Sequence, residues 1–411
     1  MITTFSELLE DKEFAKKVIL DEDIPDYDDM AWDTMDPADR ERISLYQSKK
    51  TALFAKEFVP FYKEHFKSIS ISTIENINSL EEFALTMPPT TKEHLTHNSS
   101  LSFLPILKDG FSPIRPGMIN KGTGGSTGRP VTIWFSPEDW RAMAQHIARS
   151  IKFDFRNSLD KLRGRKVLGL YHGDHVTNDI YRLGLKLLGM HLISRVSTKV
   201  DVKSNYDFLQ ETRPNGVLAP PGGFDENQTK GITLKEILKL DSRNFHGKAY
   251  RLNNDYNPKF EMLLWSSMPL TSDMHNYLKN HLKIPYIQGQ YGSTEICPTG
   301  ATCEHHPYSF HLGYGPNVVN VIHPSGTRLV GEGEKGHLLV TKSAGLHISS
   351  GKRLKIVPLG TNLINFRTGD DASLTNINGE VCYCGRNTPI LSNLERKENI
   401  QSKLIFGCQV D

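Results

Sequence analysis

QGQYGSTEICP, residues 288–298, follows the apolar run IPYIQ, which predicts a strand that ends in a tight turn. A Tyr beside Gly can stack on a nucleobase, and Glu295 at the end of the turn offers carboxylate oxygens to Mg²⁺. A turn in which Ser293 or Thr294 caps a helix has the same sequence. This segment alone therefore leaves a nucleotide site and a plain turn open.

Two further segments carry similar chemistry. In KGTGGSTGRPV, residues 121–131, glycines allow backbone N–H groups to approach an anion and hydroxyls add donors, so the loop can hold a polyphosphate. Arg129 and Pro130 stand where a Walker loop needs Lys and Ser or Thr, and a flexible linker has a similar composition. In NFRTGDDASL, residues 365–374, Asp370 follows a predicted Thr-Gly turn and can accept both ribose hydroxyls or stabilise its own turn.

The pattern of apolar residues between these segments indicates an α/β fold. Helices are expected at residues 5–19 and 37–66, with Thr90 or Thr91 as the cap of a short helix that follows. From about residue 120, short β-branched runs, of which VTIWF is the first, alternate with helical segments, which predicts a parallel sheet covered by helices on both faces. After residue 308 only short strands and Gly-rich turns are expected.

The order of the three segments resembles that of the adenylate-forming superfamily, which includes acyl-CoA synthetases, luciferases and peptide-synthetase adenylation domains. Within it the chain is similar to the phenylacetate–CoA ligase and CapK-like group. PPTTKEHL at residues 88–95 is similar to that group's PxTTKEDL, Val131 stands where other branches usually have Lys, and CYCGR at residues 382–386 matches its C-x-C-G-R element.

This resemblance implies the superfamily's large N-terminal domain, with parallel-rich sheets covered by helices and a small strand-rich subdomain. The implied divisions are a helical segment at 1–100, an ATP- and acyl-binding α/β core at 101–307, the strand-rich subdomain at 308–393, and the hinge with the start of the C-terminal domain at 394–411. KLIFGCQVD, residues 403–411, is similar to the opening of that domain. We expect a chain from which most of the C-terminal domain is absent, or a naturally short form in which Cys408 accepts the acyl group.

The resemblance also implies roles for individual residues. Glu295 with Thr294 would bind Mg²⁺ near the α-phosphate and form the catalytic pair, and Asp370 would hold the ribose. Arg396 is the best match to a ribose-contacting Arg, although LERKENI lacks the Gly that usually precedes it. The remaining nucleotide-binding positions, for the phosphates, the adenine and the region near the base, are Thr123, Gly124, Gly125, Ser126, Thr127 and Gly128, then Ser266, Ser267 and Met268, then Gln290, Tyr291, Gly292 and Ser293.

The implied activity is ATP-dependent formation of an acyl-adenylate with release of pyrophosphate, followed by transfer to coenzyme A or to another thiol or amine. An acyl-protein synthetase, and a nucleotide-binding protein of this fold with reduced catalysis, are the alternatives. ATP, Mg²⁺ and structural Zn²⁺ are the expected cofactors, with coenzyme A as one acceptor. The expected partners are a small carboxylic acid and coenzyme A or a carrier protein, and a homodimer is left open.

Cysteines and histidines near the C-terminal end suggest a metal site. Tetrahedral zinc needs four soft or borderline ligands, which a C-x-C pair and a distant Cys/His pair can supply. Our choice is Cys303, His311, Cys382 and Cys384, with His305 or Cys297 as substitutes and reduced thiols without metal as the alternative. His172 and His175 in YHGDHVTND are interpreted as solvated or capping residues, with positioning of the substrate carboxylate as the alternative. Trp265 is interpreted as a core residue, with a place in the pocket wall as the alternative.

Composition excludes some functions. Lys plus Arg number 49 and Asp plus Glu 47, so the chain has no strong field with which to hold nucleic acid or an anionic membrane. Five cysteines in 411 residues do not form a disulfide framework, which favours a reducing, cytoplasmic setting. The N-terminus MITTFSELLEDKEF has acidic residues where a signal peptide needs a basic and then an apolar region.

Overall fold

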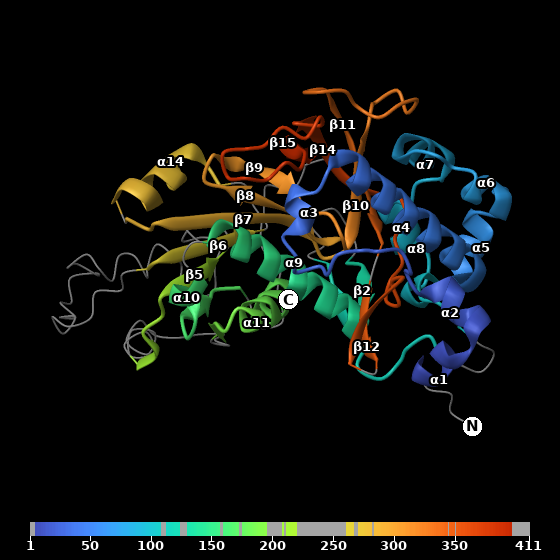
Figure 1. Cartoon of the computed structure of the whole chain (residues 1–411), viewed down its shortest axis with the longest axis horizontal. Helices are drawn as coiled ribbons and strands as arrows, with labels where there is room; N and C mark the ends of the chain where they lie inside the picture. Colours follow the sequence, from blue (N-terminus) through green and yellow to red (C-terminus); the bar gives the residue numbers. More distant parts are fainter. Residues whose placement is uncertain are drawn as a thin grey trace.

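The protein is described by a computed structural model. The described residues are 5–107, 112–123, 130–156, 159–171, 175–194, 208, 211–219, 260–266, 270–281, 283–343, 345–349 and 351–396. Helices come first along the chain and strands dominate its second half (Figure 1).

Most of the first hundred residues are helical, and α4, with 22 residues, is longer than any helix that follows it in the described part of the chain. The helical elements are α1 (Phe5–Glu10), α2 (Lys12–Val18), α3 (Ala31–Thr34), α4 (Pro37–Phe58), α5 (Pro60–His65), α6 (Ile71–Glu75), α7 (Leu80–Thr86), α8 (Lys92–His97), η1 (Ser100–Phe103), α9 (Pro137–Asp154), α10 (Leu159–Leu162), α11 (Val176–Leu187), α14 (Ser272–Asn276) and η3 (Tyr277–His281).

Eleven strands form one mixed sheet in the order β10-β11-β14-β15-β9-β8-β7-β6-β5-β3-β4. Two antiparallel pairs, β1-β2 and β12-β13, stand apart from it. The strands are β1 (Ile119–Gly122), β2 (Thr132–Phe135), β3 (Lys166–Gly169), β4 (His191–Ser194), β5 (Gly216–Ala219), β6 (Met262–Ser266), β7 (Tyr286–Ser293), β8 (Cys297–Cys303), β9 (His306–Leu312), β10 (Asn317–Ile322), β11 (Lys335–Lys342), β12 (Gly345–Ser349), β13 (Lys352–Ile356), β14 (Phe366–Thr375) and β15 (Ile390–Arg396).

The two halves of the large sheet differ in direction. Strands β4, β3, β5, β6 and β7 are parallel neighbours, as the alternation of strands and helices predicted. From β7 onward each neighbouring pair is antiparallel. The prediction that VTIWF is a strand of the parallel sheet is wrong, because β2 pairs antiparallel with β1 outside the large sheet. The two strands are four residues long, and they pair with each other along their whole length.

The N-terminal helices follow local signals. Asp11 caps α2 and therefore divides the helix expected at residues 5–19, and Pro60 begins α5 after Val59 ends α4. Thr91 caps α8, as expected, with a capping box completed by His94. Figure 1 shows α4 to α7 gathered on the β10 side of the sheet.

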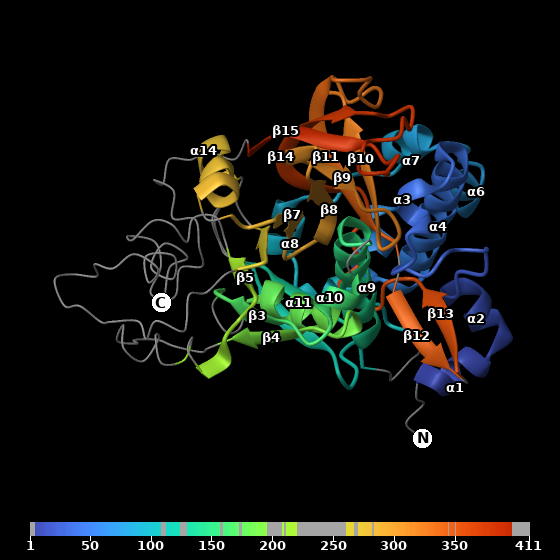
Figure 2. The ribbon, with the colours of Figure 1, turned by 60° about the vertical axis from the view of Figure 1, so that its left-hand side comes forward.

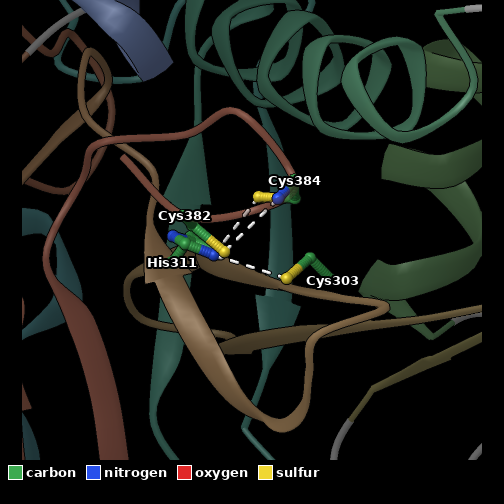
Figure 3. Close-up of side chains that lie close together, drawn as sticks. All are labelled: Cys303, His311, Cys382 and Cys384. Carbon is green, nitrogen blue, oxygen red and sulfur yellow. Dashed lines mark hydrogen bonds between the residues drawn. The ribbon is translucent and has the colours of Figure 1, made fainter. Parts of the chain in front are cut away.

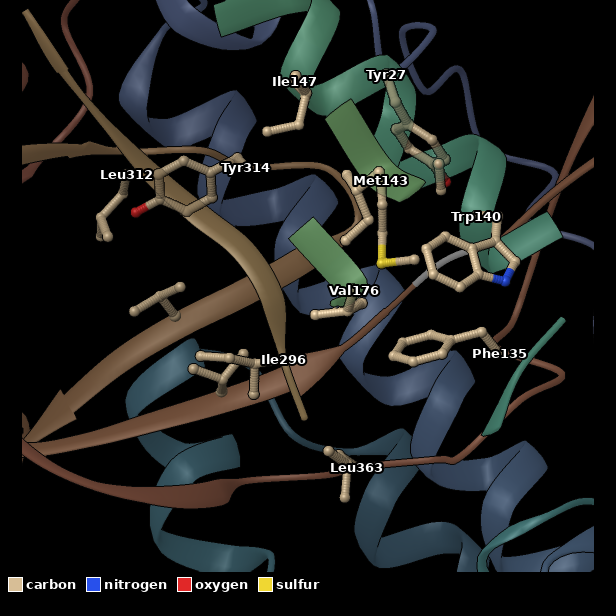
Figure 4. Packing of buried hydrophobic residues seen from close by; sticks show 14 of the residues in the cluster. Tyr27, Phe135, Trp140, Met143, Ile147, Val176, Ile296, Leu312, Tyr314 and Leu363 are labelled. Atoms are coloured by element: carbon tan, nitrogen blue, oxygen red, sulfur yellow. The ribbon is translucent and has the colours of Figure 1, made fainter. Parts of the chain in front are cut away.

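Helix α9 connects the sheet to the rest of the core. Ser136 and Asp139 form a capping box at its start, and Pro137 occupies the first turn. Its apolar face carries Trp140, Met143 and Ile147, which point into a cluster that includes residues from α11, β9 and the β7–β8 turn (Figure 4). Figure 2 shows α9 and α11 side by side, and their residues are in contact. This packing fixes α9 over the strands that lead to the candidate site.

The strands after residue 308 continue the large sheet across β10, β11, β14 and β15. The divisions at residues 100, 307 and 393 stay predictions. Within the described ranges, no helix combines the length and the apolar character needed to cross a membrane.

Gly289 in β7 makes room for a buried indole. A Cβ at Gly289 would lie 2.2 Å from Cζ2 of Trp265, whose side chain is buried, so any larger residue must displace the ring. We expect Gly289→Ala to destabilise the fold by about 1–3 kcal/mol, the usual cost of overpacking. Chemical denaturation measures the change. Gly122→Ala is the control, because nothing lies within 4 Å of a Cβ there; equal effects of the two substitutions would contradict this account.

Candidate nucleotide and metal sites

Tyr291 and Asp370 meet although 79 positions separate them. The Tyr291 hydroxyl donates a 2.7 Å hydrogen bond to Oδ2 of Asp370. Tyr291 lies near the carboxyl end of β7 and Asp370 within β14, on the antiparallel side of the sheet. Ligands of open α/β sheets bind at the carboxyl ends of the parallel strands, and this pair lies beside that edge.

The sequence predicts that Asp370 follows a sharp Thr-Gly turn, and this prediction is wrong. It lies inside β14, next to an irregularity in the pairing of β14 with β11. Gly369 has φ +86° there, a left-handed conformation that glycine adopts without strain. The Asp370 amide donates to the Thr368 hydroxyl at 3.1 Å, and Arg396 of β15 is the cross-strand partner of Asp370. The Arg396 side chain lies outside the described part of the structure.

Glu295 is buried in the turn between β7 and β8, with 4% of its surface exposed. This turn is followed by a strand, so Ser293 and Thr294 do not cap a helix. Lys92 at the start of α8 places Nζ 3.9 Å from Oε1 of Glu295. No role was predicted for Lys92, which appears in the sequence analysis only as part of PPTTKEHL. The one sequence signal for its position was the predicted cap at Thr91, which places Lys92 in the first turn of a helix. The contact gives a buried carboxylate one cationic neighbour.

Ser266 ends β6 and is held by Tyr171, a residue that sequence reasoning did not single out. The Tyr171 hydroxyl donates to the Ser266 carbonyl at 2.8 Å and accepts from the Ser266 amide at 3.1 Å. Tyr171 follows β3, so two parallel strands are tied together at their carboxyl ends. His175 caps α11 and stacks on Tyr171, which confirms its interpretation as a capping residue.

The side chains of β7 divide between the two faces of the sheet. Gln288 and Gln290 point to α9, where the Gln290 amide donates to the Ser150 hydroxyl at 2.6 Å. Gln290 therefore holds β7 on the α9 side of the sheet, near the position predicted for the base. Tyr291, one residue later, points to the opposite face, where its ring contacts Phe310. Trp265 is 2% exposed and contacts the same Phe310, which fits the interpretation as a core residue.

Of the remaining predicted nucleotide-binding positions, three lie in the described part of the structure and the others lie outside it. Thr123 begins the segment predicted to hold the phosphates, and its amide and hydroxyl are both hydrogen-bonded to the backbone of Val131 at 2.9 Å. Gly292 and Ser293 lie in β7 opposite the start of β8. The positions outside the described residues are Gly124, Gly125, Ser126, Thr127, Gly128, Ser267, Met268, His172 and Cys408.

Cys303, His311, Cys382 and Cys384 come together as one group. Their ligand atoms all lie within 4.8 Å of one another (Figure 3). Nε2 of His311 is 3.5 Å from the sulfurs of both Cys303 and Cys384. With Zn–S of about 2.3 Å and Zn–N of about 2.0 Å, a tetrahedral site separates nitrogen and sulfur ligands by about 3.5 Å. The donor set and its spacing therefore fit zinc.

The surroundings of this group favour metal binding. Nδ1 of His311 lies 3.4 Å from the Thr388 hydroxyl, and such a contact leaves Nε2 free to face the sulfurs. A hydrogen bond from Cys303, aided by His311 and the charge of Arg386, lowers the pKa of the Cys384 thiol despite its burial, whereas the same hydrogen bond and burial raise the pKa of the Cys303 thiol. His305, the suggested substitute, instead contacts the ring of Tyr383. The Cys297 side chain lies outside the described residues.

No protein-family model matches this sequence, and no curated protein sequence matches it. Solved structures do resemble its fold. A 2-hydroxyisobutyryl-CoA ligase, in an open conformation with 2-HIB-AMP and CoA, aligns with a TM-score of 0.66 at 16% identity, covering 90% of this chain and 78% of that chain. The same ligase in the thioesterification state aligns with a TM-score of 0.64 at 19% identity, covering 90% and 71%.

These likenesses concern the fold, and membership of the phenylacetate–CoA ligase group stays a prediction. The large mixed sheet with its helices is shared with an acyl-CoA ligase over nine tenths of this chain. The chain therefore has the fold of the adenylate-forming superfamily, the one that the order of its three sequence motifs predicts.

Proposed function

We propose that this protein activates a carboxylic acid with ATP, forming an acyl-adenylate and releasing pyrophosphate. The acyl group then passes to coenzyme A or to another thiol or amine. The contact between Tyr291 and Asp370 beside the carboxyl ends of the parallel strands carries the proposal, because it brings together two of the predicted nucleotide-binding segments. The likeness to a ligase solved with 2-HIB-AMP and CoA supports it.

The nucleotide would lie along the face of β7 that carries Tyr291. The Asp370 carboxylate can accept hydrogen bonds from both ribose hydroxyls, and Tyr291 holds that carboxylate in place. By the superfamily resemblance, the base would lie near Ser266, at the end of β6, and near Gln290, its cross-strand partner in β7. The phosphates would lie at residues 123–128.

Charge governs the reaction. An oxygen of the substrate carboxylate forms a bond to the α-phosphorus, the bond from that phosphorus to the bridging oxygen breaks, and pyrophosphate leaves. Both reactants are anionic, so positive charge must be supplied in a dry site. Glu295 would hold Mg²⁺, which neutralises phosphate charge when bound, and Lys92 would add a fixed positive charge.

The Cys/His group would hold one structural zinc. Three thiols and one imidazole complete a tetrahedral set, the composition typical of structural rather than catalytic zinc. The site would join β8 and β9 to the turn between β14 and β15. The cytoplasmic location stays a prediction from the cysteine count.

Acid-dependent exchange of labelled pyrophosphate into ATP tests the proposed activity. We expect exchange with at least one acid from a panel of aryl, amino and fatty acids. Glu295→Gln should lower the rate by about a hundredfold or more, as expected when a charge-stabilising group is lost. Glu93→Gln is the matched control, because Glu93 is an exposed carboxylate next to Lys92. ATP binding without exchange for any acid would favour the nucleotide-binding alternative, and acid-dependent labelling of Cys408 would favour the short acyl-protein form.

Asp370→Asn tests the ribose contact. The substitution keeps the size of the side chain and removes the charge, so we expect the Kd for ATP to rise by about ten- to a hundredfold, the loss of hydrogen bonds to a charged acceptor. Calorimetry measures the Kd. Asp371→Asn is the control on the same strand, because Asp371 contacts His337 of β11 at 2.7 Å. The ribose assignment is wrong if both variants bind ATP as the wild type does.

Metal content tests the zinc site. The protein purified without chelators should contain about one zinc per chain, and the double variant Cys382→Ser, Cys384→Ser should contain almost none, because it lacks two of four ligands. Elemental analysis settles this. Cys297→Ser should retain the metal, and loss of zinc from that variant would move a ligand role to Cys297.

A further inference from the structure

A buried arginine connects the Cys/His group to strand β7. Arg386, the last residue of CYCGR, is 1% exposed. Its Nη1 donates to Oδ1 of Asp154 at 2.5 Å and its Nη2 to the Ser150 carbonyl at 3.1 Å. Both partners lie in the last turns of α9. The guanidinium thus attaches the C-x-C turn to the end of this helix.

The same two residues of α9 hold β7. The Gln288 amide donates to the Ser150 carbonyl at 3.0 Å and also to the Asp154 carboxylate. The Gln290 amide donates to the Ser150 hydroxyl at 2.6 Å. Arg386 and the two glutamines therefore meet on a shared pair of acceptor residues, and a shift of the guanidinium must displace the strand or break these bonds.

The turn that carries Arg386 is itself fixed. The Arg386 carbonyl accepts from the Cys382 amide at 2.7 Å, and the Cys382 carbonyl accepts from the Gly385 amide at 2.7 Å. Two of the four clustered ligands, Cys382 and Cys384, belong to this turn. Figure 3 shows the turn above the strands that carry the other two, Cys303 and His311.

We propose that Arg386 is a positioning residue of the nucleotide site. Through Asp154 and Ser150 it sets the position of β7, and one residue beyond Gln290 that strand presents Tyr291 to Asp370. The Cys/His group keeps the turn of Arg386 in place, so the group supports nucleotide binding without contacting the nucleotide. This inference rests on the proposed function, because it assigns a consequence to the Tyr291–Asp370 contact.

The test compares ATP affinity by calorimetry in folded, metal-containing protein. Lys keeps the charge of Arg386 but cannot reach Asp154 and Ser150 with a rigid fork, so Arg386→Lys should raise the Kd for ATP by roughly two- to thirtyfold. Ser150→Ala removes the acceptor of Gln290 and should act in the same direction with unchanged metal content. Arg328→Lys is the matched control, because Arg328 pairs with Glu334 in a hairpin turn and is 43% exposed.

A double-mutant cycle separates positioning from general loosening. If Arg386 acts through Tyr291, then Arg386→Lys should change the Kd by less than about twofold in a Tyr291→Phe background. A full effect in that background would overturn the inference. Asp154→Asn in the same cycle decides the matter if Arg386→Lys does not fold, because it neutralises the side-chain acceptor that Arg386 and Gln288 share. Unchanged ATP affinity in Arg386→Lys and Ser150→Ala would overturn this inference alone, whereas a wild type that binds no ATP would overturn the proposed function as well.

Discussion

The arrangement depends on three buried charges and one partly exposed carboxylate, which balance one another. Asp33 from α3 lies 3.0 Å from Arg149 and 3.6 Å from Arg386, and Arg386 also pairs with Asp154. Both guanidinium groups are 1% exposed. Removing one member of such a pair leaves a buried charge uncompensated, at a cost of about 3–5 kcal/mol. The network therefore ties the N-terminal helices, α9 and the C-x-C turn into one arrangement, although long stretches of sequence separate them.

This constraint explains how one strand serves two purposes. The glutamines of β7 face α9, where Ser150 and Asp154 satisfy their amides. The opposite face carries Tyr291, which donates a hydrogen bond to Asp370. The contacts of the glutamines with α9 hold the strand in the position that this bond requires. Side chains alternate along a strand, so support and function occupy neighbouring residues. The Cys/His group lies at the far end of the same chain of contacts, since Arg386 follows Cys384 by two positions.

Sequence reasoning was most successful where a signal is local or where motif order is specific. The Thr91 cap follows from neighbouring residues, and the parallel strands from β3 to β7 follow from apolar periodicity. The grouping of Cys303 and His311 with the C-x-C pair was expected from ligand chemistry and family resemblance. The antiparallel pairing of VTIWF was missed because an apolar run does not specify its partner strand. Tyr171, Lys92 and Arg386 were missed because each acts through contacts with distant segments.

The central claim is that ATP binds across β7 and β14. A crystal structure with a non-hydrolysable ATP analogue and Mg²⁺ tests it most directly. The account predicts the ribose hydroxyls within hydrogen-bond distance of the Asp370 carboxylate, the base on the Tyr291 side of β7, and Mg²⁺ at Glu295. An analogue bound elsewhere, with the Tyr291–Asp370 contact untouched and Glu295 still facing Lys92, would contradict it.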